Sequence, residues 1–231
     1  MKTEKRQSQN SFGSLVQEAP DPDPGISRIE IDAEVPIFQI ILGRNLSGSN
    51  GKAVWIDSGN EASTYALASA GNQEIMQRVK IGRAFTAFQH FHLVNRIEEF
   101  LEPETEYIVL PNIDQQYREG VSEKESQDLF QDLLAKLESI KSERPEIRIL
   151  YSFFREDTSQ IVLQMKSMTD ESVEIERSSQ GLRRKSKREE TMFYSKPGFI
   201  QTTIPYWRRK RFENPENTVR VNYSGENELD V

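Results

Sequence analysis

Short apolar runs that alternate with helical segments constrain this chain more than any other feature. Residues 53–56 and 107–110 are uninterrupted apolar runs, which are typical of strands buried on both faces. The segment 122–143 carries apolar residues at helical spacing: Leu129, Leu133, Leu137 and Ile140. Strands that alternate with helices of this length form βαβ units. We therefore expect an α/β fold of three layers, in which helices cover both faces of a mostly parallel central sheet.

The same reasoning places the remaining elements. Further strands are expected at 28–31, 79–81 and 147–154, further helices from Pro36, at 61–70 and at 86–101, and a closing hairpin from 192–194 and 199–204. Prolines and polar residues dominate the N-terminal segment, so it is expected to be disordered. The expected organisation is a disordered segment 1–27, a core 28–176, a basic loop and closing hairpin 177–212, and a flexible tail 213–231.

Composition limits the classes of site and compartment. The chain has no cysteine, which excludes disulfides, thiolate zinc sites and cysteine nucleophiles. No apolar run approaches the roughly 20 residues of a membrane span, and the polar N-terminus does not resemble a secretory signal. We expect a cytoplasmic protein with no membrane partner.

Charge is distributed unevenly along the chain. Residues 177–211 carry eleven Lys/Arg and two Glu, a net charge of +9, whereas the whole chain carries −7. The rest of the chain therefore carries −16. A basic C-terminal third attached to an acidic body suggests either a polyanionic partner or attraction between the two parts.

Two clusters supply this positive charge, and they are the candidate nucleic-acid-binding residues. They comprise Arg183, Arg184, Lys185, Lys187 and Arg188, followed by Tyr206, Trp207, Arg208, Arg209, Lys210 and Arg211. Cations gain affinity for phosphates by releasing counterions, and aromatic rings stack on unpaired bases, so single-stranded nucleic acid is the favoured ligand. The alternatives are that these clusters fold against the protein's own acidic body, or that they have no special role.

Several strings, in order, resemble the RecA/RadA recombinase core over roughly residues 28–155. The string GKAVWIDS at 51–58 is similar to the second strand of that family, and IGRAF at 81–85 is similar to the following strand end. Residues 107–110 stand where the Walker B strand belongs, and Tyr117-Arg118-Glu119 resembles the start of the first DNA-binding loop. The chain is also similar to shortened RecA/RadA-like proteins of halophilic archaea. This resemblance implies a RecA-like fold and a role in DNA recombination or repair.

The departures from the family pattern remove its chemistry. A P-loop needs G-x-x-x-x-G-K-S/T between a strand and a helix, but residues 32–36 read DAEVP. Gly51-Lys52 precedes Ala53 and a strand, which favours a simple turn. Gly59 stands where the family has its catalytic Glu, and Pro111 follows the Walker B strand in place of a metal-binding Asp. We therefore expect no catalytic residues, no cofactor and no ATPase activity.

The remaining polar residues give weaker signals. His90 and His92 lie two apart on a predicted helix, so they point to different faces and do not form a zinc pair. Asp57, Glu61 and Asp114 could meet at the carboxyl ends of strands, either to hold a cation or simply to cap loops. Residues 155–160 stand in place of the second DNA-binding loop, which puts strand exchange in doubt.

The predicted function is a non-catalytic RecA/RadA-like accessory protein in DNA recombination or repair. It would act through contacts with a recombinase or another protein and through weak binding of single-stranded nucleic acid. One alternative is a regulatory interaction module that does not touch DNA. Another is an enzyme with a repurposed site around Asp57, Glu61 and Asp114.

Overall fold

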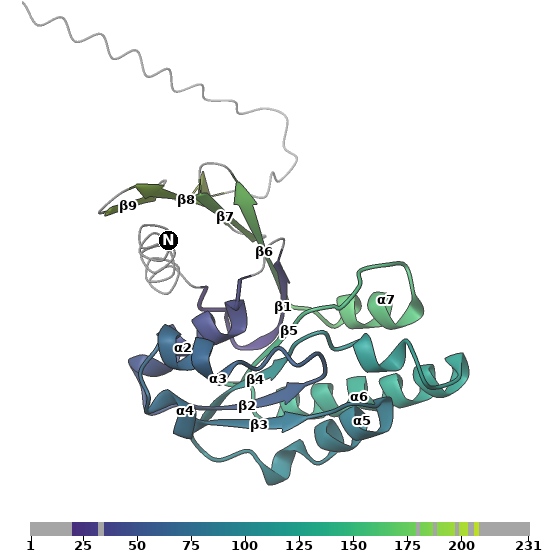
Figure 1. The fold of residues 1–231 in the computed structure, drawn as a ribbon. Coiled ribbons are helices and arrows are strands. Elements are labelled where there is room, and N and C mark those ends of the chain that lie inside the picture. The colour runs from purple at the N-terminus through teal and green to yellow at the C-terminus, as the bar shows by residue number, and fades with distance from the viewer. Residues whose placement is uncertain are drawn as a thin grey trace, which may run out of the picture.

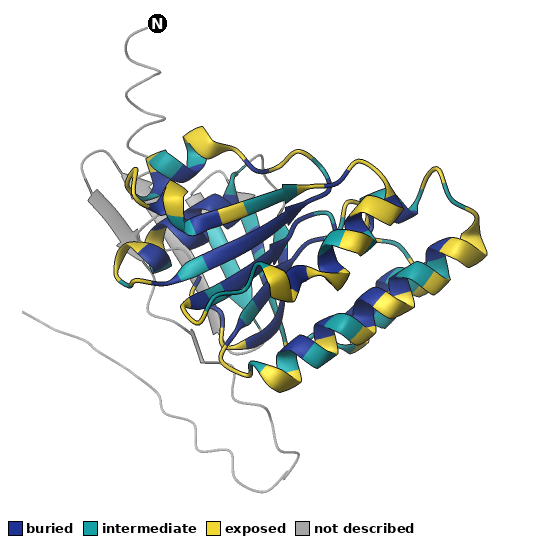
Figure 2. Cartoon of the chain, turned by 90° about the horizontal axis from the view of Figure 1, so that it is seen from below, coloured by how far each residue is buried: buried dark blue, intermediate teal, exposed yellow. Residues whose placement is uncertain are grey.

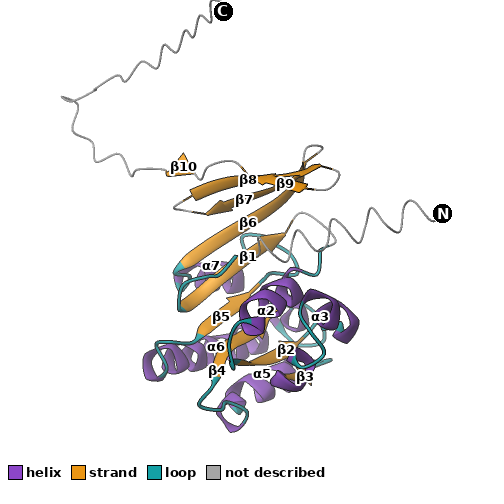
Figure 3. Cartoon of the chain, turned by 90° about the vertical axis from the view of Figure 1, so that its left-hand side faces the viewer, coloured by secondary structure: helices purple, strands orange, loops and turns teal. Residues whose placement is uncertain are grey.

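One mixed β-sheet organises the protein. The computed structural model describes residues 20–31, 35–178, 181–186, 189–196, 199–202 and 206–207, with side chains described at 20–30, 35–176 and 183–186. The strands are β1 (Gly25–Ile31), β2 (Lys52–Asp57), β3 (Val79–Arg83), β4 (Thr105–Leu110), β5 (Arg148–Tyr151), β6 (Glu171–Ser178), β7 (Gly181–Ser186), β8 (Glu189–Lys196), β9 (Phe199–Thr202) and β10 (Tyr206–Trp207). Their order across the sheet is β10-β8-β7-β6-β1-β5-β4-β2-β3, and β9 also pairs with β8 (Figure 3).

The sheet is parallel from β3 to β6 and antiparallel beyond it. Every neighbouring pair from β3 through β2, β4, β5 and β1 to β6 is parallel. From β6 onward, each described pair is antiparallel. A parallel pair needs a long crossover connection, which helices supply up to β6, whereas the short connections after β6 permit only antiparallel pairing.

Helices cover both faces of the parallel part (Figure 1). They are α2 (Ile37–Ser47), α3 (Thr64–Ala70), α4 (Ile75–Arg78), α5 (Ala87–Asn95), α6 (Glu123–Glu143) and α7 (Gln160–Ser167). Residues of α2, α3 and α4 share one apolar core with one side of the sheet, and residues of α5, α6 and α7 share a second core with the other side. The predicted three-layer α/β architecture with a mostly parallel sheet is confirmed.

The longest helix, α6, shows why the sequence folds this way locally. Ser122 caps its start by accepting a hydrogen bond from the backbone N–H of Glu125, as in a capping box. Its buried residues recur at helical spacing: Ser126, Phe130, Leu133, Leu134, Leu137 and Ile140. In Figure 2 they form one dark stripe along a helix whose other side is exposed. The stripe faces the sheet, because a helix of mixed polarity is stable only when its apolar side is covered.

Several predicted boundaries were wrong. The first strand begins at Gly25, three residues before the expected start, and Ile26 is completely buried, so the described part of the segment 1–27 is ordered from residue 20. The strand expected at 147–154 is confined to Arg148–Tyr151, and the helix expected at 86–101 ends at Asn95. The short helices α4 and α7 were not predicted. Residues 1–19 and 208–231, which include the tail 213–231, lie outside the described residues.

The basic loop expected after residue 177 is instead partly a strand. Arg183, Arg184 and Lys185 belong to β7, which pairs antiparallel with β6. Arg183 lies 3.3 Å from Glu176, and Lys185 lies 3.0 Å from Glu174, both on β6. These cross-strand ion pairs explain how a highly charged segment enters the sheet. β8 and β9 pair antiparallel where the closing hairpin was expected.

In the described part of the chain, no helix is both long enough and apolar enough to cross a membrane.

Replacement of Leu133 by alanine tests the packing of α6. The side chain is fully buried, so the substitution should lower the free energy of unfolding by about 2–5 kcal/mol. Urea unfolding measures the change. Leu163→Ala on α7, where half of the side chain is exposed, is the control and should cost less than about 0.5 kcal/mol. Equal losses in the two variants would contradict the described packing.

Candidate functional site at the carboxyl edge of the sheet

A pocket of about 720 Å³ opens at the carboxyl ends of β1, β4 and β5. It is lined by Arg28, Ile29, Glu30, Val35, Pro36, Ile37, Phe38, Gln39, Glu61, Ser63, Pro111, Asn112, Ser152, Phe153, Phe154 and Glu156. The chain leaves β1 toward α2 on one face of the sheet, whereas it leaves the adjacent β5 toward α7 on the other face. Ligands of open α/β sheets bind at such switch points, so this pocket is the candidate site.

Arg28 organises the charges at one side of the pocket. Its guanidinium lies 2.9 Å from the carboxylate of Glu30 and also pairs with Glu156. The same guanidinium lies over the ring of Phe153, 5.6 Å from the ring centroid. Lys166 on α7 forms a second ion pair with Glu156. Arg28 is therefore held by two carboxylates and an aromatic face, which fixes its position.

The carboxylates around Arg28 have shifted acidities. Partial burial raises the pKa of Glu30, and the nearby Glu156 and Glu174 raise it further against the opposing effect of Arg28. The hydrogen bond from Lys166 lowers the pKa of Glu156. Among the described residues of the lining, three are glutamates, one is an arginine and none is a lysine. Such a lining repels a polyphosphate and favours a cationic or apolar group.

Asp57 and Glu61 hold the loop that follows β2. The buried carboxylate of Asp57 accepts hydrogen bonds from the backbone N–H groups of Glu61 and Ala62, at 2.8 and 3.2 Å. Glu61 accepts a hydrogen bond of 3.1 Å from the Asn112 side chain, which joins this loop to the end of β4. Asp57 therefore caps a loop, which is the second of the two roles considered from the sequence.

Asp114 has a similar role on the next loop. Its buried carboxylate accepts a hydrogen bond of 2.6 Å from the backbone N–H of Phe154 and pairs with Arg118. Arg118 also lies 2.7 Å from Asp157, and this contact lowers the pKa of Asp157. In the part of the chain that the structure describes, no three His, Asp or Glu side chains form a metal-binding group. The structure thus separates Asp57 and Asp114 into two loop caps and offers no shared cation site.

The two histidines have different environments. His90 is fully buried on α5, where its Nδ1 lies 3.0 Å from the hydroxyl of Tyr117 and the two rings meet edge to face. Burial lowers the pKa of His90 to about 4, so the ring is neutral at neutral pH. His92 is exposed. His90 packs in the core, and it makes no pair with His92.

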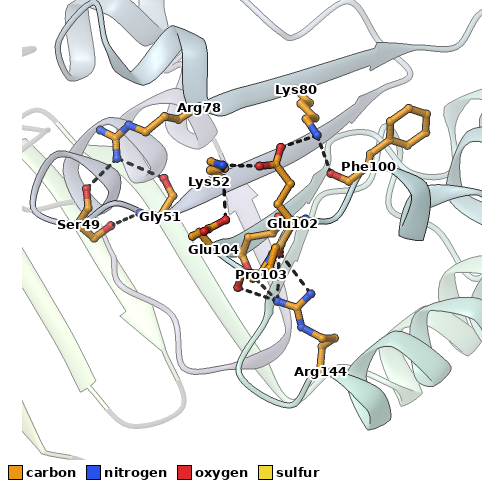
Figure 4. Close-up of polar contacts among 11 residues, drawn as sticks. Ser49, Gly51, Lys52, Arg78, Lys80, Phe100, Glu102, Pro103, Glu104 and Arg144 are labelled. Atoms are coloured by element: carbon orange, nitrogen blue, oxygen red, sulfur yellow. Dashed lines mark hydrogen bonds and ion pairs between the residues drawn. The ribbon is translucent and has the colours of Figure 1, made fainter.

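The Gly51-Lys52 pair lies at the opposite, amino edge of the sheet (Figure 4). The ammonium of Lys52 pairs with Glu102, which also lies 2.6 Å from Lys80 and has its pKa lowered to about 2, chiefly by the hydrogen bond from Lys52. Arg78 donates to backbone carbonyls of the preceding turn, including those of Ser49 and Gly51. These contacts fix a turn before a strand, as the sequence indicated, and the Lys52 ammonium is remote from the pocket.

The predicted nucleic-acid residues are only partly within the described chain. Arg183 and Lys185 are engaged with Glu176 and Glu174 in the sheet. Tyr206 and Trp207 form β10, whose backbone pairs with residues 189–190. The side chains of these two aromatics and all of Lys187, Arg188, Arg208, Arg209, Lys210 and Arg211 lie outside the described residues.

Sequence reasoning missed the pocket itself, because its described walls come from segments that are distant in the sequence: 28–30 with 35–39, 61–63, 111–112 and 152–156. The one local signal was the pattern Arg28-Ile29-Glu30, which puts two charges on the same side of a strand otherwise rich in isoleucine. Comparison with protein-family models and with curated proteins gives no match. The residues and the geometry therefore carry the functional argument.

The buried His90 predicts an acid-sensitive fold. In the unfolded chain its pKa returns to about 6.5, so between about pH 6.5 and pH 4 the unfolded state takes up a proton that the folded state does not. The free energy of unfolding should therefore fall as the pH falls through this window, by about 2 kcal/mol at pH 5.

Urea unfolding at pH 7 and pH 5 measures this loss. The variant His90→Gln keeps a polar partner for Tyr117 and does not titrate, so it should lose less stability on acidification. His92→Gln is the matched control and should behave like the unsubstituted protein. An equal pH dependence in His90→Gln and the unsubstituted protein would refute this role of His90.

Proposed function

We propose that this protein is a RecA/RadA-like accessory factor of DNA recombination or repair that does not hydrolyse ATP and acts through protein contacts. The main support for this proposal is the charge of the pocket at the carboxyl ends of β1, β4 and β5. It lies where an α/β protein of this type would hold a nucleotide, yet its charged lining is Glu30, Glu61 and Glu156 against Arg28 alone. A phosphoryl-transfer site needs the reverse balance, with cations around the phosphates.

The order of the strands supports a RecA-like assignment over other nucleotide-binding folds. The doubly wound dinucleotide-binding order is 3-2-1-4-5-6, and the flavodoxin-like order is 2-1-3-4-5. Here the order is β3-β2-β4-β5-β1-β6, with β1 between β5 and β6. The strings that resemble the RecA/RadA family fall on β2, on β3 and on β4, in the order that the resemblance requires.

The end of β4 supports the absence of metal-dependent chemistry. Pro111 follows β4 directly, and its carbonyl accepts a hydrogen bond of 2.7 Å from the Ser58 hydroxyl. Asn112 then adopts a left-handed conformation with φ of 50°. The nearest following carboxylate, Asp114, is already bonded to Arg118 and to the backbone of Phe154. No carboxylate at this strand end is thus placed to hold a metal beside the pocket.

Exposed aromatic rings at the same edge support binding of a protein. Phe154, on the pocket wall, is 56% exposed, and Phe85, in the loop after β3, is 72% exposed. Phe85 lines a smaller hollow of about 230 Å³ together with residues of the loop after β2, including Asn60, and Glu61 of that loop lines the larger pocket. Aromatic residues are enriched in protein interfaces, so an active RecA/RadA-type recombinase is the proposed partner.

The alternative is a regulatory module that never touches nucleic acid. The cross-strand pairs of Arg183 and Lys185 with Glu176 and Glu174 favour it, because they already neutralise part of the first basic cluster. Nucleic-acid binding, if it occurs, would then depend on residues 206–211, where two aromatics adjoin four cations.

Calorimetry with Mg-ATP tests the loss of the nucleotide site. Titration into the full chain should give no heat of binding at protein concentrations of tens of micromolar, because the pocket lining repels phosphate. An intact RecA/RadA-type ATPase, titrated under the same conditions, is the positive control. A dissociation constant in the micromolar range for this chain would refute the proposal.

Binding to the recombinase tests the proposed partner. The full chain should bind the active RecA/RadA-type recombinase of the same organism, and Phe85→Ala combined with Phe154→Ala should weaken binding at least about tenfold, as loss of interface anchors does. Surface plasmon resonance measures the affinities. Leu163→Ala, an exposed apolar residue on α7, is the matched control and should leave the affinity unchanged. No binding, or equal binding by all variants, would show that Phe85 and Phe154 at this edge do not form the interface.

A further inference from the structure

The candidate pocket has a charge and a shape that match a segment of the same chain. Glu30, Glu61 and Glu156 line it, and among the described residues no cation lies within ion-pairing distance of Glu61. Arg28 is the only cation among the described lining residues, and it is already engaged with Glu30 and Glu156, while Lys166 on α7 also pairs with Glu156. Three glutamates against these two cations leave an excess of negative charge at a concave surface, where the field of the carboxylates is focused.

The walls of the pocket are partly apolar. Phe38, Phe153 and Phe154 lie among the lining residues, and Val35 and Pro36 add aliphatic surface beside them. Of these rings Phe154 is 56% exposed, and a purely ionic ligand would leave it uncovered. A peptide that alternates cationic and aromatic side chains would satisfy both parts of the lining, since guanidinium groups pair with carboxylates and also stack on rings.

Such a peptide occurs in this chain at 206–212, with the sequence YWRRKRF. The register of the sheet fixes where it starts. Glu30 pairs with Glu174, Glu174 with Lys185, Lys185 with Glu190, and Glu190 with Tyr206, so one row runs across the sheet from the pocket to β10. The row spans four strand spacings, about 19 Å. About six extended residues cover that distance, so Arg211 and Phe212 are the first residues after β10 that can reach the pocket.

We propose that the pocket at the carboxyl ends of β1, β4 and β5 receives the far end of the protein's own basic segment 208–212 in an intramolecular contact. The contact brings Arg211 to the carboxylates of Glu30, Glu61 and Glu156, and covers the exposed ring of Phe154 with Phe212. The cations before Arg211 approach the acidic pocket from β10 and add to the attraction. It needs neither a recombinase partner nor DNA, but it covers the ring of Phe154, so the basic segment and the proposed recombinase would compete for this edge.

Tethering makes a weak contact sufficient. A segment joined to its site by a short flexible linker has an effective concentration in the millimolar range, so a modest intrinsic affinity fills the site. The pKa of Glu30 is raised first by its partial burial and then by the neighbouring Glu156 and Glu174, so an added cation would stabilise its ionised form. The attraction is electrostatic and falls as the screening length shrinks from about 10 Å at 0.1 M salt to about 3 Å at 1 M.

The absence of cysteine makes a direct distance measurement simple. Spin labels are attached to cysteines introduced by Thr158→Cys, on the exposed loop beside Glu156, and by Asn214→Cys, just after the basic segment. Double electron–electron resonance on the full chain should give a short, narrow distance distribution at 0.1 M salt. At 1 M salt the distribution should become longer and broader, and it should not depend on protein concentration.

Two charge-matched variants locate the contact. Glu30→Gln with Glu61→Gln and Glu156→Gln removes three negative charges from the pocket and should give the long distribution even at low salt. Asp128→Asn with Asp132→Asn and Glu138→Gln removes three negative charges from α6 and should leave the short distance in place. A short distance that persists in the pocket variant, or a long distance in all proteins, would overturn the proposal. A short distance that appears only at high protein concentration would also overturn it, because the segment would then come from a second copy.

A second measurement does not depend on the pocket variant folding. A labelled peptide of residues 204–215 is titrated into the full chain in which Arg208, Arg209, Lys210 and Arg211 are replaced by alanine. This protein has an empty pocket and should bind the peptide at least about tenfold more tightly than the unsubstituted chain, where the tethered segment competes. Equal affinities would refute the contact, whatever the outcome of the ATP and recombinase experiments.

Discussion

The insertion of β1 between β5 and β6 is the contact on which the rest of the structure depends. Ile26 and Ile29 on this strand enter the two apolar cores on opposite faces of the sheet. The start of the strand is fixed by hydrogen bonds of 2.9 Å from the Gly25 N–H to the Ile147 carbonyl and 2.8 Å from the Ile26 N–H to Asp170. β1 connects β5 to β6, the strand at which the sheet changes from parallel to antiparallel, and its carboxyl end forms one wall of the pocket.

The switch point of the sheet, which holds a nucleotide in other α/β folds, here forms an acidic pocket. The backbone still converges on the switch point between β1 and β5, so a concave surface is unavoidable. The side chains at that surface decide what it can hold, and Glu30, Glu61 and Glu156 make it a place for cations and rings. The carboxylates of Asp57 and Asp114 stabilise the loops around it by accepting backbone hydrogen bonds. Under the function proposed above, the fold is retained without the chemistry that it commonly supports.

Sequence patterns predicted the elements whose buried residues follow a regular pattern. They failed for elements whose structure depends on contacts with another segment of the chain. β2, β4 and α6 were recognisable because each has an uninterrupted or periodic apolar pattern. The prolines before β1 suggested disorder, yet carbonyls in this stretch accept hydrogen bonds, including one of 2.8 Å from Arg148 to Pro22. β7 looked like a loop because its cations lie beside carboxylates of β6 only after the two strands pair. The pocket could not be predicted because no local pattern shows that residues 28–30 and 35–39 meet residues 152–156.

The position of β1 also has a consequence for the order in which the chain can fold. Of the described strands this one leaves the ribosome first, yet its partners are Arg148–Tyr151 and Glu171–Ser178, more than a hundred residues later. Closing a loop of that length is entropically slow, and a strand awaiting its neighbours exposes unpaired backbone and apolar side chains. The strands β2 to β5 can assemble with their helices beforehand, leaving one side of β5 open. β1 is synthesised before the other described strands and is therefore among the last of them to pair. Until β6 has emerged, it must avoid pairing with other strands.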